Sequence, residues 1–258
     1  MSSQLNLRYE KEKYRNFFGR NIDQMAVLLA SGRVPMSTNQ LMERRLEVRN
    51  PKFGEDYKDQ IIESVSDAIW TNCVDTGDGV LYHPDGRIRV VTDAEFLRRL
   101  TPQSRLSSGA VVLDDGAWNN AKDAPTFTRD QVQRDRFGTV WLALAQDDKA
   151  LLREYRDAVT AELKARHNYN GENMGVWLAN AKYVTTGRLW CVDRSFSYSD
   201  ALGYDLDDDV GRFVGVVPEA QRASFTSEEL LDLTKDLIPE ERKQELRERL
   251  TRVYTSSK

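Results

Sequence analysis

The stretch that decides the fold of this sequence is VLYHPDGRIRVV, residues 80–91. Two runs rich in Val, Leu, Ile and Tyr flank Pro84-Asp85-Gly86. Proline presets the φ of a turn and glycine tolerates a positive φ, so the two runs are predicted to pair as a β-hairpin. The chain is therefore expected to contain an antiparallel sheet, to which other segments add strands or helices.

Further β-rich runs follow the hairpin. They cover residues 109–113, 174–178, 187–192 and 211–217, and the last two are dense in Val, Leu, Phe and Trp. These runs are expected to join the hairpin in one sheet. Residues 75–217 would then supply every strand.

Helical periodicity precedes and follows these strands. Apolar residues recur at steps of three or four at Tyr14, Phe18, Ile22, Met25 and Leu29, which predicts one helix over all of them. The same spacing predicts helices over residues 41–46, 57–69, 96–100, 128–136 and 147–163, and two more between 230 and 253.

The order of these elements predicts an α+β fold, with a mainly antiparallel sheet, helices packed on one face, and helical N- and C-terminal segments. A chain of 258 residues can bury a sufficient core without a metal or a disulfide. We expect a single globular domain over 1–258. Its sub-regions would be a helical segment 1–74, an α+β core 75–226, and C-terminal helices 227–258.

Cysteine usage and hydropathy indicate a soluble cytoplasmic protein. Cys73 and Cys191 lie far apart in apolar settings and outside any Cys-x-x-Cys pair, so buried reduced thiols are expected. A disulfide between them is the alternative. The polar start of the chain and the lack of a run of roughly 18 apolar residues predict that it is neither exported nor membrane-spanning.

Charge is unevenly distributed along the chain. Residues 1–58 hold eleven Lys and Arg against seven Asp and Glu, whereas residues 59–258 hold 26 against 34. The basic front is compatible with contact to nucleic acid or an acidic partner, but its bases are interleaved with acids, which is typical of a solvated helix face.

Clustered aspartates are the candidate metal ligands that the sequence favours. With two histidines, His83 and His167, a zinc site built on imidazoles is excluded. Asp75, Asp78 and Asp85 bracket a glycine-rich turn and the hairpin, and clustered carboxylates are the ligands that magnesium prefers. The alternative is that all three are solvated turn residues.

Other catalytic patterns fail on spacing. The run Asp205-x-Asp207-x-Asp209 begins like a calcium loop, but Val210 stands where that loop needs glycine and Val216 where it needs glutamate. There is no phosphate loop and no Gly-x-Ser-x-Gly motif. The sequence therefore predicts no cofactor, and it leaves open whether the protein is an enzyme.

A polar and aromatic segment, residues 194–204, is the candidate binding loop. Arg194, Phe196, Tyr198 and Tyr204 alternate there with serines and an aspartate, a mixture that recognition loops often carry. A plain connection between two strands is the alternative.

Three hypotheses for function follow. The first is a soluble intracellular binding or interaction protein with protein or nucleic-acid partners, which uses the 194–204 loop. The second is a magnesium-dependent hydrolase or phosphotransfer enzyme that uses Asp75, Asp78 and Asp85. The third is a structural or oligomerising subunit that packs through its C-terminal helices. The oligomeric state does not follow from the sequence.

Overall fold

The structure is a computed structural model, and it describes residues 14–49, 69–70, 72–134, 138–168, 174–180, 183–193 and 199–218. Contacts divide the chain into two units, Met1–Val216 and Val217–Lys258, and every helix and strand given below belongs to the first. The predicted helix 57–69 lies almost wholly outside the described residues, and the C-terminal helices of 227–258 lie entirely outside them. The single-domain expectation for 1–258 stays a prediction.

Helices and strands are interspersed along this unit. The strands are β1 (Tyr14–Phe18), β2 (Val34–Pro35), β3 (Val74–Tyr82), β4 (Arg87–Val91), β5 (Leu106–Ser107), β6 (Ala110–Val112), β7 (Thr126–Thr128), β8 (Val176–Trp177), β9 (Thr186–Val192), β10 (Ala201–Tyr204) and β11 (Arg212–Val216). The helices are α1 (Asn21–Ala30), α2 (Thr38–Arg49), α5 (Glu95–Arg98), α6 (Asp115–Asn120), α7 (Arg129–Arg134), α8 (Thr139–Leu144) and α9 (Lys149–His167). The prediction of an α+β fold is confirmed.

The hairpin forms as the sequence predicts. β3 and β4 pair antiparallel, with Tyr82 opposite Ile88. The turn is closed by the Gly86 amide, which donates to the His83 carbonyl at 3.0 Å, and by the His83 amide, which donates to the Arg87 carbonyl at 2.9 Å. Gly86 has a φ of 89°, the left-handed conformation for which a glycine was expected.

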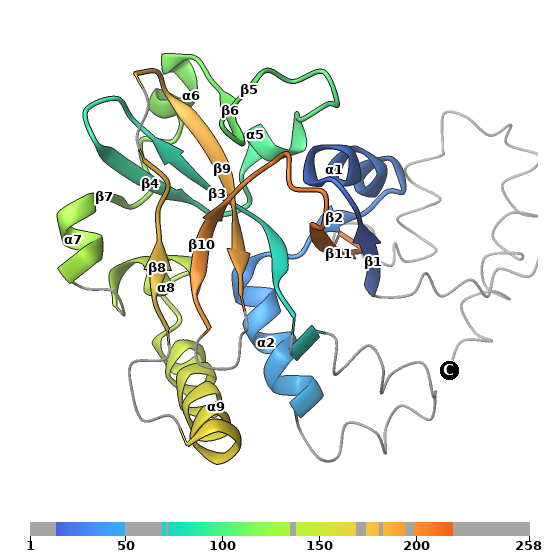
Figure 1. Cartoon of the computed structure of the whole chain (residues 1–258), viewed down its shortest axis with the longest axis vertical. Helices are drawn as coiled ribbons and strands as arrows, with labels where there is room; N and C mark the ends of the chain where they lie inside the picture. The colour runs from blue at the N-terminus through green and yellow to red at the C-terminus, as the bar shows by residue number, and fades with distance from the viewer. Residues whose placement is uncertain are drawn as a thin grey trace, which may run out of the picture. The chain divides into compact units, whose positions relative to one another are not determined.

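The sheet runs in the order β1-β11-β3-β9-β10-β8, with further strands paired beside this path. Eight of its ten strand pairings are antiparallel, and β10–β8 and β11–β3 are parallel. The sheet is therefore mainly antiparallel. Along this path β1 and β8 are the two ends, and Figure 1 shows β8 beside β10 on one side and β1 beside β11 on the other.

The N-terminal part of the described chain joins the sheet, which corrects the expectation of a helical segment 1–74. Tyr14 and Phe18 lie in β1, and only the later part of the predicted stripe forms the helix α1. β1 pairs antiparallel with β11, and β2 pairs with the end of the same strand. Pairing with a strand almost two hundred residues away therefore overrides the local helical spacing.

Helices cover both faces of the sheet, which corrects the expectation of one covered face. Alternate residues of a strand point to opposite faces. On β9, Trp190 belongs to the core cluster formed with α2, α8 and α9, whereas Leu189 belongs to the cluster formed with α1 and α5. All residues of β3, β9 and β11 are buried, as expected for strands packed on both sides.

The longest helix, α9, follows its predicted pattern. Asp148 caps its first turn by accepting from the amides of Ala150 and Leu151 at 3.0 and 2.9 Å. Tyr155 and Val159 lie fully buried on its core-facing side. Among the helices that the structure describes, none has the length and apolar character needed to cross a membrane.

Candidate functional site

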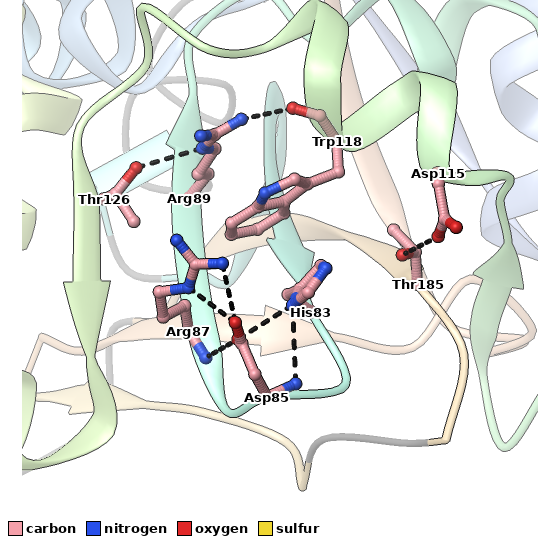
Figure 2. A network of polar contacts seen from close by, with 8 residues as sticks. All are labelled: His83, Asp85, Arg87, Arg89, Asp115, Trp118, Thr126 and Thr185. Atoms are coloured by element: carbon pink, nitrogen blue, oxygen red, sulfur yellow. Dashed lines mark hydrogen bonds and ion pairs between the residues drawn. The ribbon is translucent and has the colours of Figure 1, made fainter.

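Asp85, the first of the predicted metal ligands, lies in the exposed hairpin turn and is already paired. Figure 2 shows its carboxylate between Arg87 and His83. Arg87 Nη2 and Nε lie 2.6 and 2.7 Å from Asp85 Oδ2, and His83 Nδ1 lies 2.8 Å from Oδ1. The hydrogen bond from Arg87 holds the pKa of Asp85 well below its ordinary value. A metal ion at this carboxylate would have to displace a guanidinium.

The same network ties helix α6 to the hairpin (Figure 2). Trp118 of α6 is 4% exposed, and its ring lies 4.8 Å from the His83 ring, centroid to centroid. The guanidinium of Arg89 lies 4.1 Å from the centroid of the Trp118 ring, and its Nε donates to Thr126 at 3.0 Å. The guanidinium stacked on the indole and the hydrogen bonds of this cluster hold α6 against the hairpin, which is a structural role.

Asp78, the second predicted ligand, organises the backbone around it. It is fully buried on β3. Its Oδ2 accepts from the amide of Thr38, the first residue of α2, at 2.7 Å, and its Oδ1 accepts from the amide of Asp93 at 2.8 Å. Burial raises the pKa of Asp78, and the two amides oppose that shift. Both oxygens are thus used to fix a helix start and a turn.

Asp75, the third predicted ligand, is buried, and only one of its carboxylate oxygens accepts a hydrogen bond of ordinary geometry. Asp75 is 2% exposed, and its Oδ2 accepts a hydrogen bond from the amide of Arg212 at 2.6 Å. Its Oδ1 is buried and accepts no hydrogen bond of ordinary geometry, although the Asn21 amide lies near enough to lower the carboxyl's pKa. Burial is the dominant influence and raises the pKa of Asp75 from 3.8 to about 7.

The three aspartates do not form one cluster. Asp78 and Tyr82 are four residues apart on β3, which is roughly 13 Å at about 3.3 Å per residue, and Asp85 lies beyond Tyr82 in the turn. In the part of the chain that the structure describes, the one close group of three candidate metal-ligand side chains is Cys73, Asp75 and Cys191. The magnesium hypothesis stays a prediction, with no shared site for its ligands.

Cys73 and Cys191 form a disulfide, which corrects the expectation of two free thiols. Their Cα atoms lie 6.4 Å apart, within the usual range for a disulfide. Asp75 and Cys191 are direct cross-strand partners, and Cys73 precedes Asp75 by two residues. While the sulfurs are bonded to each other they are unavailable as thiolate ligands, so this group could hold a metal only after reduction.

The β8–β10 edge carries an exposed tryptophan held in a fixed position. Trp177 of β8 is 65% exposed, yet its Nε1 donates to Asp200 Oδ2 at 2.6 Å. Asp200 is 6% exposed, and its Oδ1 accepts from the Gly175 amide at 2.5 Å. The parallel pairing of β8 with β10 places Trp177 opposite Leu202. A large aromatic surface is therefore presented to solvent at little further entropic cost.

This edge adjoins the predicted binding loop. Arg194, Phe196 and Tyr198 lie outside the described residues. The chain on either side of them is fixed, because the Asp193 amide donates to the Asp200 carbonyl at 2.9 Å. Tyr204, the fourth predicted residue, is half-buried at the end of β10, and burial together with a hydrogen bond to Asp208 raises the pKa of its phenol. The binding prediction for this loop is not tested by these contacts.

The sequence did not predict two features of the candidate site. Trp177 was included in a predicted strand, and only its exposure and its bond to Asp200 distinguish it from a core residue. The closeness of Asp75 to both cysteines depends on the register between β3 and β9. The spacing Cys73-x-Asp75 in a β-rich run was the one available signal, because residues two apart on a strand share a face.

Comparison with known proteins defines the fold and leaves the function open. No family model and no curated protein matches this chain. A solved structure, described as showing the accommodation of massive sequence variation in Nanoarchaeota by the C-type lectin fold, is similar with a TM-score of 0.53 and 14% identity. The similarity covers 80% of this chain and 99% of that chain. We conclude that the chain has a fold similar to the C-type lectin fold.

Proposed function

We propose that this chain is a binding protein that recognises a protein partner at its β8–β10 edge. The observation that carries the proposal is Trp177, an exposed indole held by a hydrogen bond to the buried Asp200. Tryptophan is enriched among the residues that dominate binding energy at protein interfaces, and a pre-positioned ring loses little freedom when it is covered.

The fold is suited to this use. The similar structure is described as a C-type lectin fold that accommodates massive sequence variation. In this chain, Trp177 belongs to neither core cluster, whereas its neighbours Val176 and Ala201 pack in one of them, so the exposed indole can change without disturbing the core. A framework that is independent of its exposed side chains is what a recognition module requires.

Charge favours a protein over a nucleic acid as the partner. The indole of Trp177 is anchored on the carboxylate of Asp200. Residues 59–258, which include this edge, hold 34 acidic against 26 basic side chains. Nucleic-acid binding depends on Lys and Arg neutralising phosphates, so the acidic balance of this part of the chain opposes it.

The proposed binding does not depend on the cellular compartment of the protein. The cytoplasmic location expected from the sequence stays a prediction. Disulfides such as Cys73–Cys191 are typical of oxidising environments.

The test compares Trp177→Ala with Phe18→Ala in the full chain. Phe18 is also an exposed aromatic residue, at 61%, but it lies on β1 at the opposite end of the strand order. Proteins retained by the immobilised wild-type chain are identified by mass spectrometry, and the affinity of the purified partner is then measured. We expect Trp177→Ala to weaken binding about 30-fold or more, as for a central interface aromatic, and Phe18→Ala to leave it unchanged.

Two outcomes would reject the proposal. The first is equal binding by both variants, and the second is a loss of capture after nuclease treatment. Affinities are compared at a temperature where both variants are folded, because Trp177→Ala also removes a hydrogen bond from the buried Asp200 carboxylate.

A further inference from the structure

The Cys73–Cys191 disulfide lies against the carboxyl group of a buried acid. Cys73 immediately precedes β3 and lies two residues before Asp75, and Cys191 faces Asp75 from β9. All three side chains therefore lie on one face of the sheet. A carboxylate oxygen of Asp75 lies within 4.8 Å of both sulfur atoms.

The two sulfurs differ in their surroundings. Cys191 is fully buried in the core cluster that contains Leu189, Leu206 and Phe213. Cys73 is only half-buried and packs at the border of the same cluster. A thiolate that approaches from solvent therefore meets Cys73 first. In-line attack there makes Cys191 the leaving sulfur.

A leaving thiolate at Cys191 needs a proton. An unpaired anion in an apolar core is strongly disfavoured, whereas a neutral thiol behaves as a small apolar group. Asp75 is the carboxyl group beside it, and burial keeps that carboxyl in its protonated form at higher pH than usual.

The surroundings of Asp75 allow it to hold this proton. The groups that influence its carboxyl are the Arg212 amide, the Asn21 side chain and the Asp208 carboxylate. Its charge also acts on the phenol of Tyr204. The Arg212 guanidinium contacts the Phe18 ring at 5.0 Å, and burial lowers its pKa. No carboxylate–guanidinium pair involves Asp75 in the described part of the chain.

We propose that Cys73–Cys191 is a site of thiol–disulfide exchange for a dithiol substrate, with Cys73 as the attacked sulfur and Asp75 as the proton donor to Cys191. A thiolate of the substrate bonds to Cys73 Sγ while the Cys73–Cys191 bond breaks. The electron pair of that bond passes to Cys191 Sγ, which takes the Asp75 proton. The second thiolate of the substrate then attacks the substrate's first sulfur in the mixed disulfide, and Cys73 leaves as a thiolate.

The reaction balances in electrons and protons. The dithiol is oxidised to a cyclic disulfide, and the protein disulfide is reduced to two thiols. Cys73 and Asp75 each recover a proton from solvent. Cys191 lies opposite Leu202 of β10, but the two tests change different residues, Trp177 and Asp75, so the partner-capture experiment and the experiment below can fail separately.

The test measures the rate at which dithiothreitol reduces the full chain. Free thiols are trapped with a maleimide at successive times and counted by intact mass. Wild type is compared with Asp75→Asn, which keeps the size of the side chain but has no acidic proton. Asp209→Asn is the matched control, because Asp209 is exposed.

We expect Asp75→Asn to be reduced about 100-fold more slowly at pH 7, at the lower end of the usual range for loss of a general acid. The rate per dithiothreitol thiolate should fall as pH rises past about 7 in wild type, following Asp75, and stay flat in Asp75→Asn. The control should match wild type. With a monothiol such as glutathione, the mixed disulfide should map to Cys73.

Several results would overturn the proposal. They are free thiols in the chain purified without reductant, equal reduction rates in wild type and Asp75→Asn, or an adduct on Cys191. A rate that rises steeply with low concentrations of urea would also overturn it, because reduction would then require global unfolding.

Discussion

Replacing Asp75 by asparagine is expected to stabilise the protein at neutral and alkaline pH. Asparagine has nearly the same shape, and its carbonyl oxygen can still accept the Arg212 amide hydrogen bond. What the substitution removes is the charge, which the wild-type chain must otherwise bury when the carboxyl ionises.

The size of the effect follows from the pKa of Asp75, which is about 7 in the folded protein against an ordinary 3.8. Between these values the folded chain keeps a proton that the unfolded chain has lost. Stability from this group is therefore complete below about pH 4 and is lost as pH rises through 7. At about 1.4 kcal/mol per pH unit, the wild type loses roughly 4 kcal/mol by pH 8 that Asp75→Asn retains.

The assay is urea unfolding of both proteins at intervals from pH 4 to pH 8, without reductant so that the disulfide stays intact. The quantity of interest is the difference in the free energy of unfolding between the two proteins. Taking the difference cancels the other titrating groups, including Asp78, whose raised pKa gives a slope of the same sign, and Asp85, whose lowered pKa gives the opposite sign. Asp209→Asn should show no such difference.

A flat difference across this range would refute the reasoning, since it would mean that Asp75 titrates alike in the folded and unfolded chains. A difference that grows in favour of wild type with rising pH would refute it more strongly. In that case the ionised carboxylate would have to be stabilised in the fold, against the dominance of burial.

Two further substitutions test the structural roles of buried polar groups. Asp78→Asn should destabilise the fold by about 1–3 kcal/mol, because its amide group would face one of the two backbone donors that Asp78 now satisfies; urea unfolding measures this loss. Arg45→Ala should cost about 3–5 kcal/mol in the same assay, because the fully buried guanidinium donates to the Tyr155 hydroxyl and to three backbone carbonyls, among them that of Val192.

Local sequence patterns were sufficient to predict the helices and strands that are determined by nearby residues. The hairpin of residues 80–91 is determined by its own turn residues, and α9 by its apolar spacing and its cap at Asp148. β1 could not be predicted in this way, because its partner, β11, lies at the other end of the described chain. The apolar run 189–192 at the end of β9 did carry a usable signal, since strands buried on both faces lack polar alternation.

The site was less predictable than the fold. Asp75 and Asp78 were singled out as acidic residues near glycines, and nothing local distinguishes them from solvated turn residues. Their burial follows from the central place of β3 between β11 and β9. Likewise, Trp177 resembles any core tryptophan until the edge position of β8 and the carboxylate of Asp200 are known.

Asp75 and Asp78 lie three residues apart on the same strand, and the difference between their hydrogen bonds indicates the role of Asp75. Asp78 uses both oxygens to bind backbone amides, which fully accounts for a buried carboxylate. Asp75 uses one oxygen fully, whereas its Oδ1 is buried and accepts no hydrogen bond of ordinary geometry, and the same holds for Oδ1 of the neighbouring Asn21. An asparagine or serine could accept the Arg212 amide without the cost of a buried acid. The remaining distinction of a carboxyl group is its exchangeable proton, and the Cys73–Cys191 disulfide lies within reach of it.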